Sequence, residues 1–420
     1  MKKKAGIILL SIAVLFLLLI LLTTRLQQGG NGHNTGNGSG ATERGYDLTI
    51  LTPDVAYDEF RSFISDAEKK LNMRIRLVAT AQDAESREAQ VSNYLTSGKA
   101  EIDLITINDE MASEFIPKGY LEPIGKDTLP DEIRESYPET YFDKVCTYKG
   151  KVYSVPYYMD VMMFWVNQKF LDEAGVENLD TQENVDRFLD TDFGDDRYPY
   201  GSAWEQSYAY NDLFQHVNLF GGDYLNWKDE ESRRALWYLR DLVMKGRTPE
   251  DQVMDQYDQM EQKFIEGRYG CMYLYSGGMN ILLNSGRYSE EELHISDIPS
   301  FYEKKTIIAT WQFAVNHASP NKEAAMKFIK YVSGDEGAEK YSNDTHRAPA
   351  RLDILNEKTL DIPDIDLIRD YTKKYELLSR HMTTDPMSGI KDMGNLFQRY
   401  VGAEITMEEF CEKAQKIVDS

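Results

Sequence analysis

The sequence lacks the residues and motifs on which most enzymes of its size depend. It has only three cysteines, Cys146, Cys271 and Cys411, without C-x-x-C spacing, so neither a disulfide framework nor a zinc site is expected. No H-E-x-x-H, G-x-S-x-G, G-x-x-x-x-G-K-[ST] or G-x-G-x-x-G stretch occurs. We therefore expect no metal, no cofactor and no enzymatic activity. A glycoside hydrolase, which needs only two facing carboxylates, remains a remote alternative among 70 acidic residues.

Positive charge is also scarce. The chain has 47 Lys and Arg against 70 Asp and Glu, a net charge of −23, and the acidic excess lies in residues 46–420. Such a field repels phosphate backbones and anionic lipid headgroups, so we expect neither a nucleic-acid partner nor broad electrostatic docking to membranes. A length of 420 residues with 42% hydrophobic residues predicts a folded protein of two or three domains, or one large two-lobed body.

One long apolar run stands at the start of the chain. Residues 7–22 read IILLSIAVLFLLLILL, and with their neighbours they give about 20 residues, or roughly 30 Å of helix, enough to span a bilayer. Lys2 to Lys4 precede the run, which predicts a cytoplasmic N-terminus and an extracellular remainder. We therefore expect residues 1–26 to be a single-pass anchor in the cell membrane. The alternative is a cleaved signal peptide and a secreted protein, but no A-x-A cleavage pattern follows the run.

After the apolar run the composition changes twice. Residues 27–45 are mostly Gly, Asn, Ser, Thr and Gln, which predicts a flexible tether with a span of roughly 25 Å. Strand and helix patterns then alternate, which predicts a parallel sheet whose ligand edge lies at residues 52–54, 80–82 and 108–110. The expected strands are 46–52, 73–80, 102–107, 151–156, 271–275 and 307–316. The expected helices are 55–72, 83–97, 109–117, 205–220, 231–244, 255–266, 320–333 and 335–342, with a helical tail over 365–418.

Four stretches of the chain, taken in order, carry a family resemblance. They are EIDLITINDEMASEFIPKGYLEPI at 101–124, GKVYSVPYYMDVMMFWVNQKFLDEAGV at 150–176, KFIEGRYGCMYL at 263–274, and ASPNKEAAMKFIKYVSGDEGAEKY followed by RAPAR at 318–351. Through them the chain resembles the extracellular solute-binding proteins of ABC importers, family 1, which contains maltose-binding protein and other sugar-binding proteins. The resemblance extends from about Tyr46 to Asp419.

The resemblance implies an architecture and a function. The fold would be α/β, a two-lobed periplasmic-binding-protein fold of type II with an interlobe cleft, preceded here by the transmembrane helix. Lobe 1 would comprise residues 46–158 and 312–360, and lobe 2 residues 159–311 and 361–420. The protein would act as a monomer that captures a mono- or oligosaccharide and delivers it to ABC permease subunits. A membrane-tethered ligand sensor or assembly subunit with the same fold is the alternative.

The resemblance also nominates carboxylates for the cleft. Glu110 and Asp160 fall where the family has acidic residues that bond sugar hydroxyls, and Asp54 stands at the end of the first expected strand. Each carboxylate can accept two or more hydrogen bonds from hydroxyls. The alternative for each is a solvated surface acid.

Aromatic side chains complete the expected site, because the apolar face of a pyranose stacks on a ring. The nominated rings are Trp204, Tyr210, Tyr275 and Trp311, and ordinary core packing is the alternative for each. The chain lacks the Trp of maltose-specific members at Leu51, at Ile107 and after the glycine of 275–279. These departures argue against maltodextrin as the ligand.

Overall fold

The computed structural model describes residues 45–194, 196–380 and 386–419. The expected anchor, residues 1–26, and nearly all of the expected tether lie outside the described residues. Within the described part, no helix is both long enough and apolar enough to cross a bilayer.

The first part of the described chain alternates strand and helix as predicted. It contains β1 (Leu48–Thr52), η1 (Pro53–Ala56), α2 (Asp58–Leu71), β2 (Ile75–Ala79), α3 (Ala84–Thr96), β3 (Leu104–Asn108) and α4 (Asp109–Phe115). Strand β1 pairs in parallel with both β2 and β3. Helix α2 buries Phe60, Phe63, Ile64, Ala67 and Leu71, a spacing of three and four residues that places them in one apolar stripe. The parallel arrangement brings the carboxyl ends of the three strands to one edge.

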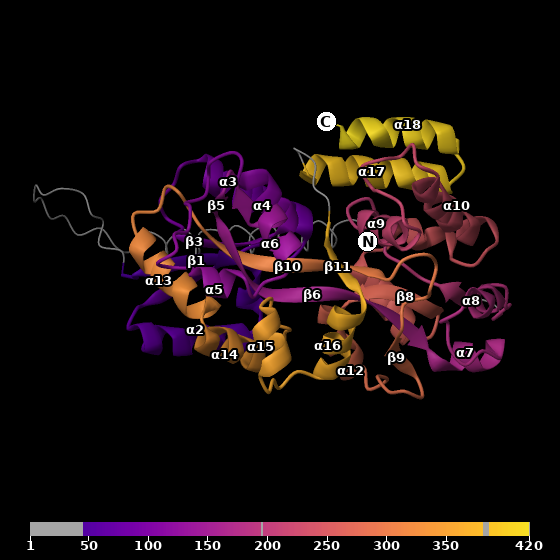
Figure 1. The fold of residues 1–420 in the computed structure, drawn as a ribbon, viewed down its shortest axis with the longest axis horizontal. Coiled ribbons are helices and arrows are strands. Elements are labelled where there is room, and N and C mark those ends of the chain that lie inside the picture. The colour runs from indigo at the N-terminus through magenta and orange to yellow at the C-terminus, as the bar shows by residue number, and fades with distance from the viewer. Residues whose placement is uncertain (1–44, 195, 381–385, 420) are drawn as a thin grey trace, which may run out of the picture. The chain divides into compact units, whose positions relative to one another are not determined.

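Two long strands, β6 (Ser154–Asn167) and β10 (Lys305–Val315), run side by side through the middle of the nine-stranded sheet (Figure 1). Strand β10 pairs antiparallel with β3 on one side and with β6 on the other. The second half of β6 pairs antiparallel with β8 (Tyr269–Tyr275). Strand β8 in turn pairs in parallel with β7 (Tyr198–Tyr200). The sheet is therefore mixed, and β6 and β10 connect its two ends.

The remaining elements surround these two ends. Before β6 lie α5 (Asp131–Arg134), α6 (Glu139–Val145), β4 (Thr147–Tyr148) and β5 (Lys151–Val152). Between β6 and β10 lie α7 (Gln168–Ala174), α8 (Gln182–Leu189), α9 (Ala209–Leu219), α10 (Glu230–Met244), η2 (Glu250–Met254), α11 (Tyr257–Ile265), η3 (Ser276–Gly278), α12 (Met279–Asn284) and β9 (Leu293–Ser296). After β10 lie α13 (Lys322–Ser333), α14 (Asp335–Thr345), α15 (Leu352–Glu357), α16 (Ile365–Lys374), β11 (Glu376–Ser379), α17 (Pro386–Val401) and α18 (Met407–Val418).

The predicted helical tail over 365–418 is wrong at one point. Strand β11 interrupts it and pairs in parallel with the start of β10, from Lys305 opposite Glu376 to Ile308 opposite Ser379. Four residues, ELLS, are too few to show a strand period in the sequence, and the pairing with β10 decides their conformation. Because β11 ends at Ser379, it brings Arg380 to the middle of the sheet.

A bulge lies near the start of β6. The register with β10 shifts between Trp311, opposite Tyr158, and Gln312, opposite Pro156, so that Tyr157 is the extra residue. Pro156 has no backbone N–H to contribute to the ladder at this point. The short strand expected at 151–156 is therefore a two-residue β5 followed by the much longer β6.

Helix α17 packs closely against the loop before α9. A Cβ added at Gly394 would lie 1.9 Å from the carbonyl oxygen of Gln206, so the backbones touch where no side chain fits. We expect Gly394→Ala to lower the free energy of unfolding by about 1–3 kcal/mol, although alanine favours a helix. Chemical unfolding measures the change. Asn395→Ala, at an exposed position of the same helix, is the control and should be neutral or stabilising. Equal stability of the two variants would contradict the close packing.

Candidate functional site

A cavity of about 390 Å³ lies between the residues that follow β1, β2 and β3 and those around β8 and α11. All three predicted strand ends reach it, through Asp54 after β1, Gln82 after β2 and Glu110 after β3. Five of the seven nominated site residues line it, namely Asp54, Glu110, Asp160, Tyr275 and Trp311. The structure therefore brings together side chains that are more than 250 residues apart in the sequence.

Asp54 is held by Tyr157 at the bulge of β6, and Asp160, three residues further along β6, is held by η3. Asp54 is buried and accepts a hydrogen bond of 2.6 Å from the hydroxyl of Tyr157. Asp160 lies 3.5 Å from the Ser276 hydroxyl and accepts a bond from the Gly277 backbone N–H. A Cβ at Gly277 would lie only 2.8 Å from Asp160 Oδ1, so glycine permits the close approach. Burial raises the pKa of Asp160, and Arg347 opposes the shift.

Arg347 is the cation on this side of the cavity. Its guanidinium lies 4.4 Å from the ring centre of Tyr158 and 5.5 Å from that of Tyr57. It interacts electrostatically with Asp54 and Asp160. Two carboxylates and one guanidinium between aromatic rings provide both acceptors and donors for a polar ligand.

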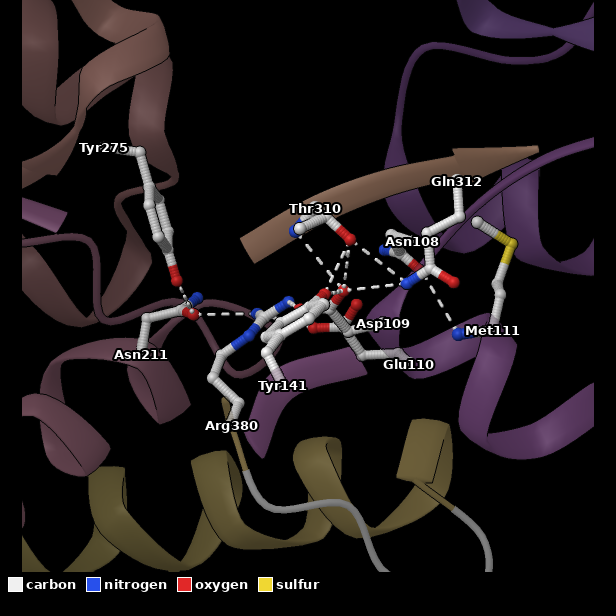
Figure 2. A network of polar contacts seen from close by, with 10 residues as sticks. All are labelled: Asn108, Asp109, Glu110, Met111, Tyr141, Asn211, Tyr275, Thr310, Gln312 and Arg380. Atoms are coloured by element: carbon white, nitrogen blue, oxygen red, sulfur yellow. Dashed lines mark hydrogen bonds and ion pairs between the residues drawn. The ribbon is translucent and has the colours of Figure 1, made fainter. Parts of the chain in front are cut away.

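A second polar network crosses the cavity floor (Figure 2). Arg380 Nη1 forms an ion pair with Glu110 Oε1 at 2.5 Å and donates to Asn211 Oδ1 at 2.9 Å, and its Nη2 lies 3.4 Å from Asp109 Oδ2. The Tyr275 hydroxyl donates to the same Asn211 oxygen at 3.0 Å. The network thus links α4, at one end of the sheet, to α9 and β8 at the other.

Asp109 is the most enclosed carboxylate of this network. Its Oδ1 accepts hydrogen bonds from the Tyr141 hydroxyl, from the backbone N–H of Thr310 at 3.3 Å and from Gln312 Nε2 at 3.2 Å. Burial raises the pKa of Asp109, while Arg380 opposes the shift. Because Arg380 is also almost fully buried, each charge depends on the other for compensation.

Trp311 lies on β10 and lines the cavity, but one face of its ring is already covered. The guanidinium carbon of Arg87 lies 5.1 Å from its ring centre. Arg87 is fixed there by a bond of 2.6 Å from Nη1 to the carbonyl oxygen of Gln82. A ligand can stack on this ring only at the remaining face or by displacing Arg87.

The other two nominated rings do not line the cavity. Trp204 is fully buried, its indole N–H donates to Asp212 at 2.7 Å, and its ring packs on Phe397. Tyr210 is buried against Tyr224. In this structure both rings pack in the core, and the neighbouring Tyr208 reaches the cavity in their place.

The residues compared with maltose-specific members are also placed by the structure. Leu51 and Ile107 are fully buried strand residues and do not line the cavity. A Trp at either place would therefore lie in the core of this chain. The comparison of rings at these two positions gives no information on the ligand here.

Sequence reasoning missed several residues that line the cavity. They are Arg87, Glu88, Tyr208, Tyr257, Glu261, Arg347, Arg380 and Lys391. Tyr208 belongs to the aromatic run that supplied Trp204 and Tyr210, and Arg347 belongs to the RAPAR stretch of the resemblance. Both could therefore have been nominated from the sequence. Arg380 could not, because the strand that positions it was not predicted.

The buried pairing of Arg380 can be tested by removing it. We expect Arg380→Met to cost about 3–5 kcal/mol in the free energy of unfolding near neutral pH, because two carboxylates lose their buried partner. The deficit should shrink as the pH falls from about 8 to 5, since protonation removes the unpaired negative charge. Denaturant unfolding at several pH values measures both effects. Arg399→Met breaks an exposed pair with Glu404 and should cost less than about 1 kcal/mol. A pH-independent deficit would contradict this assignment.

Solved structures of other proteins share the fold. Maltose-bound T. maritima MalE3 is 15% identical, with a TM-score of 0.74 over 89% of this chain and 98% of that one. An ABC transporter solute-binding protein from Thermotoga lettingae, bound to α-D-tagatose, is 19% identical, with a TM-score of 0.73 over 88% and 99%. UgpB from Mycobacterium tuberculosis, in complex with glycerophosphocholine, is 16% identical, with a TM-score of 0.74 over 89% and 97%. These likenesses establish the mixed α/β, two-lobed periplasmic-binding-protein fold.

A family model gives the relationship at the level of sequence. The model of bacterial extracellular solute-binding proteins matches residues 63–363, which is most of the described chain. The match covers β2, β3, β6, β8 and β10 and all four stretches that carried the resemblance. It confirms the expectation of a binding protein rather than an enzyme. The chain belongs to the bacterial extracellular solute-binding proteins.

Proposed function

We propose that this protein captures a small solute, a mono- or oligosaccharide, in its cavity and delivers it to the permease of an ABC importer. The observation that carries the proposal is the convergence of Asp54, Glu110, Asp160 and Trp311 on one cavity. Carboxylates and rings in this combination suit hydroxyl groups and pyranose faces. Proteins with the same fold have been solved with maltose, with α-D-tagatose and with glycerophosphocholine, and the tagatose-bound one is an ABC transporter solute-binding protein.

The proposed lobes follow the boundaries expected from the sequence, 46–158 with 312–360 and 159–311 with 361–420. Strand β6 crosses the boundary just before Asp160, and β10 crosses it next to Trp311. A change in the twist of these two strands would move the lobes toward or away from each other as rigid bodies. Asp54 and Glu110 would then approach Asp160 and Tyr275 around the solute. The protein would act as a monomer, since the cavity draws on one chain.

Binding without turnover is the first test of this function. In a panel of neutral, amino and acidic saccharides, one class should raise the melting temperature of the full-length protein in detergent, because it binds only the folded state. Asp160→Ala and Trp311→Ala should each weaken that ligand by roughly 5- to 150-fold, which corresponds to about 1–3 kcal/mol. Calorimetric titration measures the affinity, and chromatography of the mixture checks that no product appears.

Matched surface variants are the controls for these two substitutions. Asp186→Ala on α8 and Trp237→Ala on α10 replace the same residue types at exposed positions outside the cavity. Both should bind as the native protein does. Unchanged affinity in Asp160→Ala and Trp311→Ala would show that the solute binds elsewhere, and the absence of any binding saccharide would reject the carbohydrate proposal.

We further propose that residues 1–26 anchor the protein in the cell membrane and that residues 27–45 tether the binding domain outside. A spanning helix is inserted almost irreversibly, whereas one acyl chain holds only marginally. The mature protein should therefore keep Met1 and stay with membranes in high salt until detergent or a protease acts on the tether. Fractionation followed by N-terminal sequencing measures this. A mature N-terminus anywhere in 23–41 would show signal-peptide cleavage and secretion.

A further inference from the structure

Glu261 on α11 is a buried acid without a partner. Its exposed fraction is 7%, and it lines the cavity. No residue within 45–194, 196–380 or 386–419 donates a hydrogen bond to its carboxylate or forms an ion pair with it. Burial raises the pKa of Glu261 to about 7, and Asp258 adds to the shift. A solvated surface acid would show none of these features, so the position calls for a ligand group.

Two further carboxylates on the opposite wall are incompletely paired. Glu110 Oε1 forms an ion pair with Arg380, but Glu110 Oε2 is buried and has no hydrogen-bond partner in the described structure. Glu88 on α3 lines the cavity and forms no ion pair with a described residue. Burial, with a smaller contribution from the charge of Glu110, raises the pKa of Glu88 to about 7. The unsatisfied acceptors thus lie on both walls of the cavity.

The charges that line the cavity do not balance. Among the described residues, the acids are Asp54, Glu85, Glu88, Glu110, Asp160 and Glu261, and the bases are Arg87, Arg347, Arg380 and Lys391. Arg380 is shared with Asp109 behind it, and Lys391 is paired with the exposed Glu85 at 3.2 Å. With all six acids ionised, the cavity therefore carries an excess of negative charge, which attracts a cation.

The arrangement fits an organic cation better than a metal ion. In the described part of the chain, no three acidic, His or Cys side chains are close enough together to hold a metal. Tyr257, one turn before Glu261 on α11, lines the cavity with its hydroxyl unpaired, and its ring meets those of Tyr208 and Tyr275 edge to face. Aromatic rings beside a carboxylate are a favourable environment for an ammonium group.

We propose that the solute carries an ammonium group, which binds between Glu261 and the tyrosine rings, with Glu88 and Glu110 supplying the negative field from the opposite wall. The ligand class is an amino-substituted saccharide, and its hydroxyl groups bond Asp54, Asp160 and Arg347. This assignment rests on the proposed carbohydrate function and makes its substrate class specific.

Three matched sugars test the proposal on the full-length protein in detergent. They are 6-amino-6-deoxyglucose, glucose and 6-acetamido-6-deoxyglucose, each also as the non-reducing end of cellotetraose. Calorimetric titration near pH 7.5 should show the amine binding at least about tenfold more tightly than both neutral forms, because only the amine gains a charge-assisted bond to a buried carboxylate. Equal or tighter binding of a neutral form, or no binding of the amine, would overturn the proposal.

A pair of variants on one helix localises the ammonium site. Glu261→Gln keeps the size of the side chain and should weaken the amine about tenfold or more while changing any neutral saccharide less than about twofold. Glu266→Gln, on an exposed residue five positions further along, is the control and should change neither. Equal weakening of amine and neutral forms by Glu261→Gln would point to a structural role and reject the assignment.

The native protein offers a second readout that needs no variant. The charged group acting on Glu261 is Asp258, with Tyr257 one turn earlier on α11, and those acting on Glu88 are Arg87, Glu110, Glu114 and Lys391. Affinity for the amine should rise from about pH 6 to pH 8, since Glu88 and Glu261 lose protons while an alkyl amine stays charged. A flat or falling profile would contradict the proposal. Binding of a neutral saccharide in that case would leave the carbohydrate function standing.

Discussion

The buried charge of Arg380 constrains the middle of this protein. Removing a guanidinium and two carboxylates from water costs several kcal/mol per ion, and only complete pairing offsets the loss. Arg380 contacts Asp109 and Glu110 on α4 and Asn211 on α9 at the same time, and only its Nε and Glu110 Oε2 lack a hydrogen-bond partner within this described network. Because Tyr275 bonds the same Asn211 oxygen, β8 is held in the same arrangement. The walls of the cavity are therefore positioned by one residue that contacts both.

Strands β6 and β10 determine how the two walls face each other. The bulge at Tyr157 lies three residues before Asp160, and the two residues contact different partners: Tyr157 bonds Asp54, while Asp160 contacts η3. One strand thus contributes to both ends of the sheet within four residues. Pairing between β6 and β10 keeps these contacts in register, and two antiparallel strands can still change their twist at modest cost. This combination of fixed register and adjustable twist suits a hinge.

The sequence predicts the N-terminal half of the fold well because its signals are local. Strands β1, β2 and β3 are short apolar segments separated by amphipathic helices, and their shared edge follows from parallel pairing. Asp54 and Glu110 could be placed at the cavity for that reason. Trp204 and Tyr210 could not be separated from Tyr208, since all three lie in one aromatic run and only packing against Phe397 and Tyr224 decides which are buried. Arg380 and Glu261 owe their environments to contacts across long sequence separations, which no local pattern records.

The two sides of the cavity differ in how completely their carboxylates are paired with groups of the protein. Asp54 and Asp160 receive hydrogen bonds from their own chain and face Arg347, so the carboxylates near the bulge already have partners within the protein. Glu88 and Glu261 have no such partners, and burial raises the pKa of each to about 7. A bound proton lowers the cost of keeping these carboxyls out of water, so the empty protein tolerates them near neutral pH. A bound ammonium group would replace that proton with a charge of the same sign. The same two acids can therefore be stable in the empty cavity and still discriminate a charged solute from a neutral one.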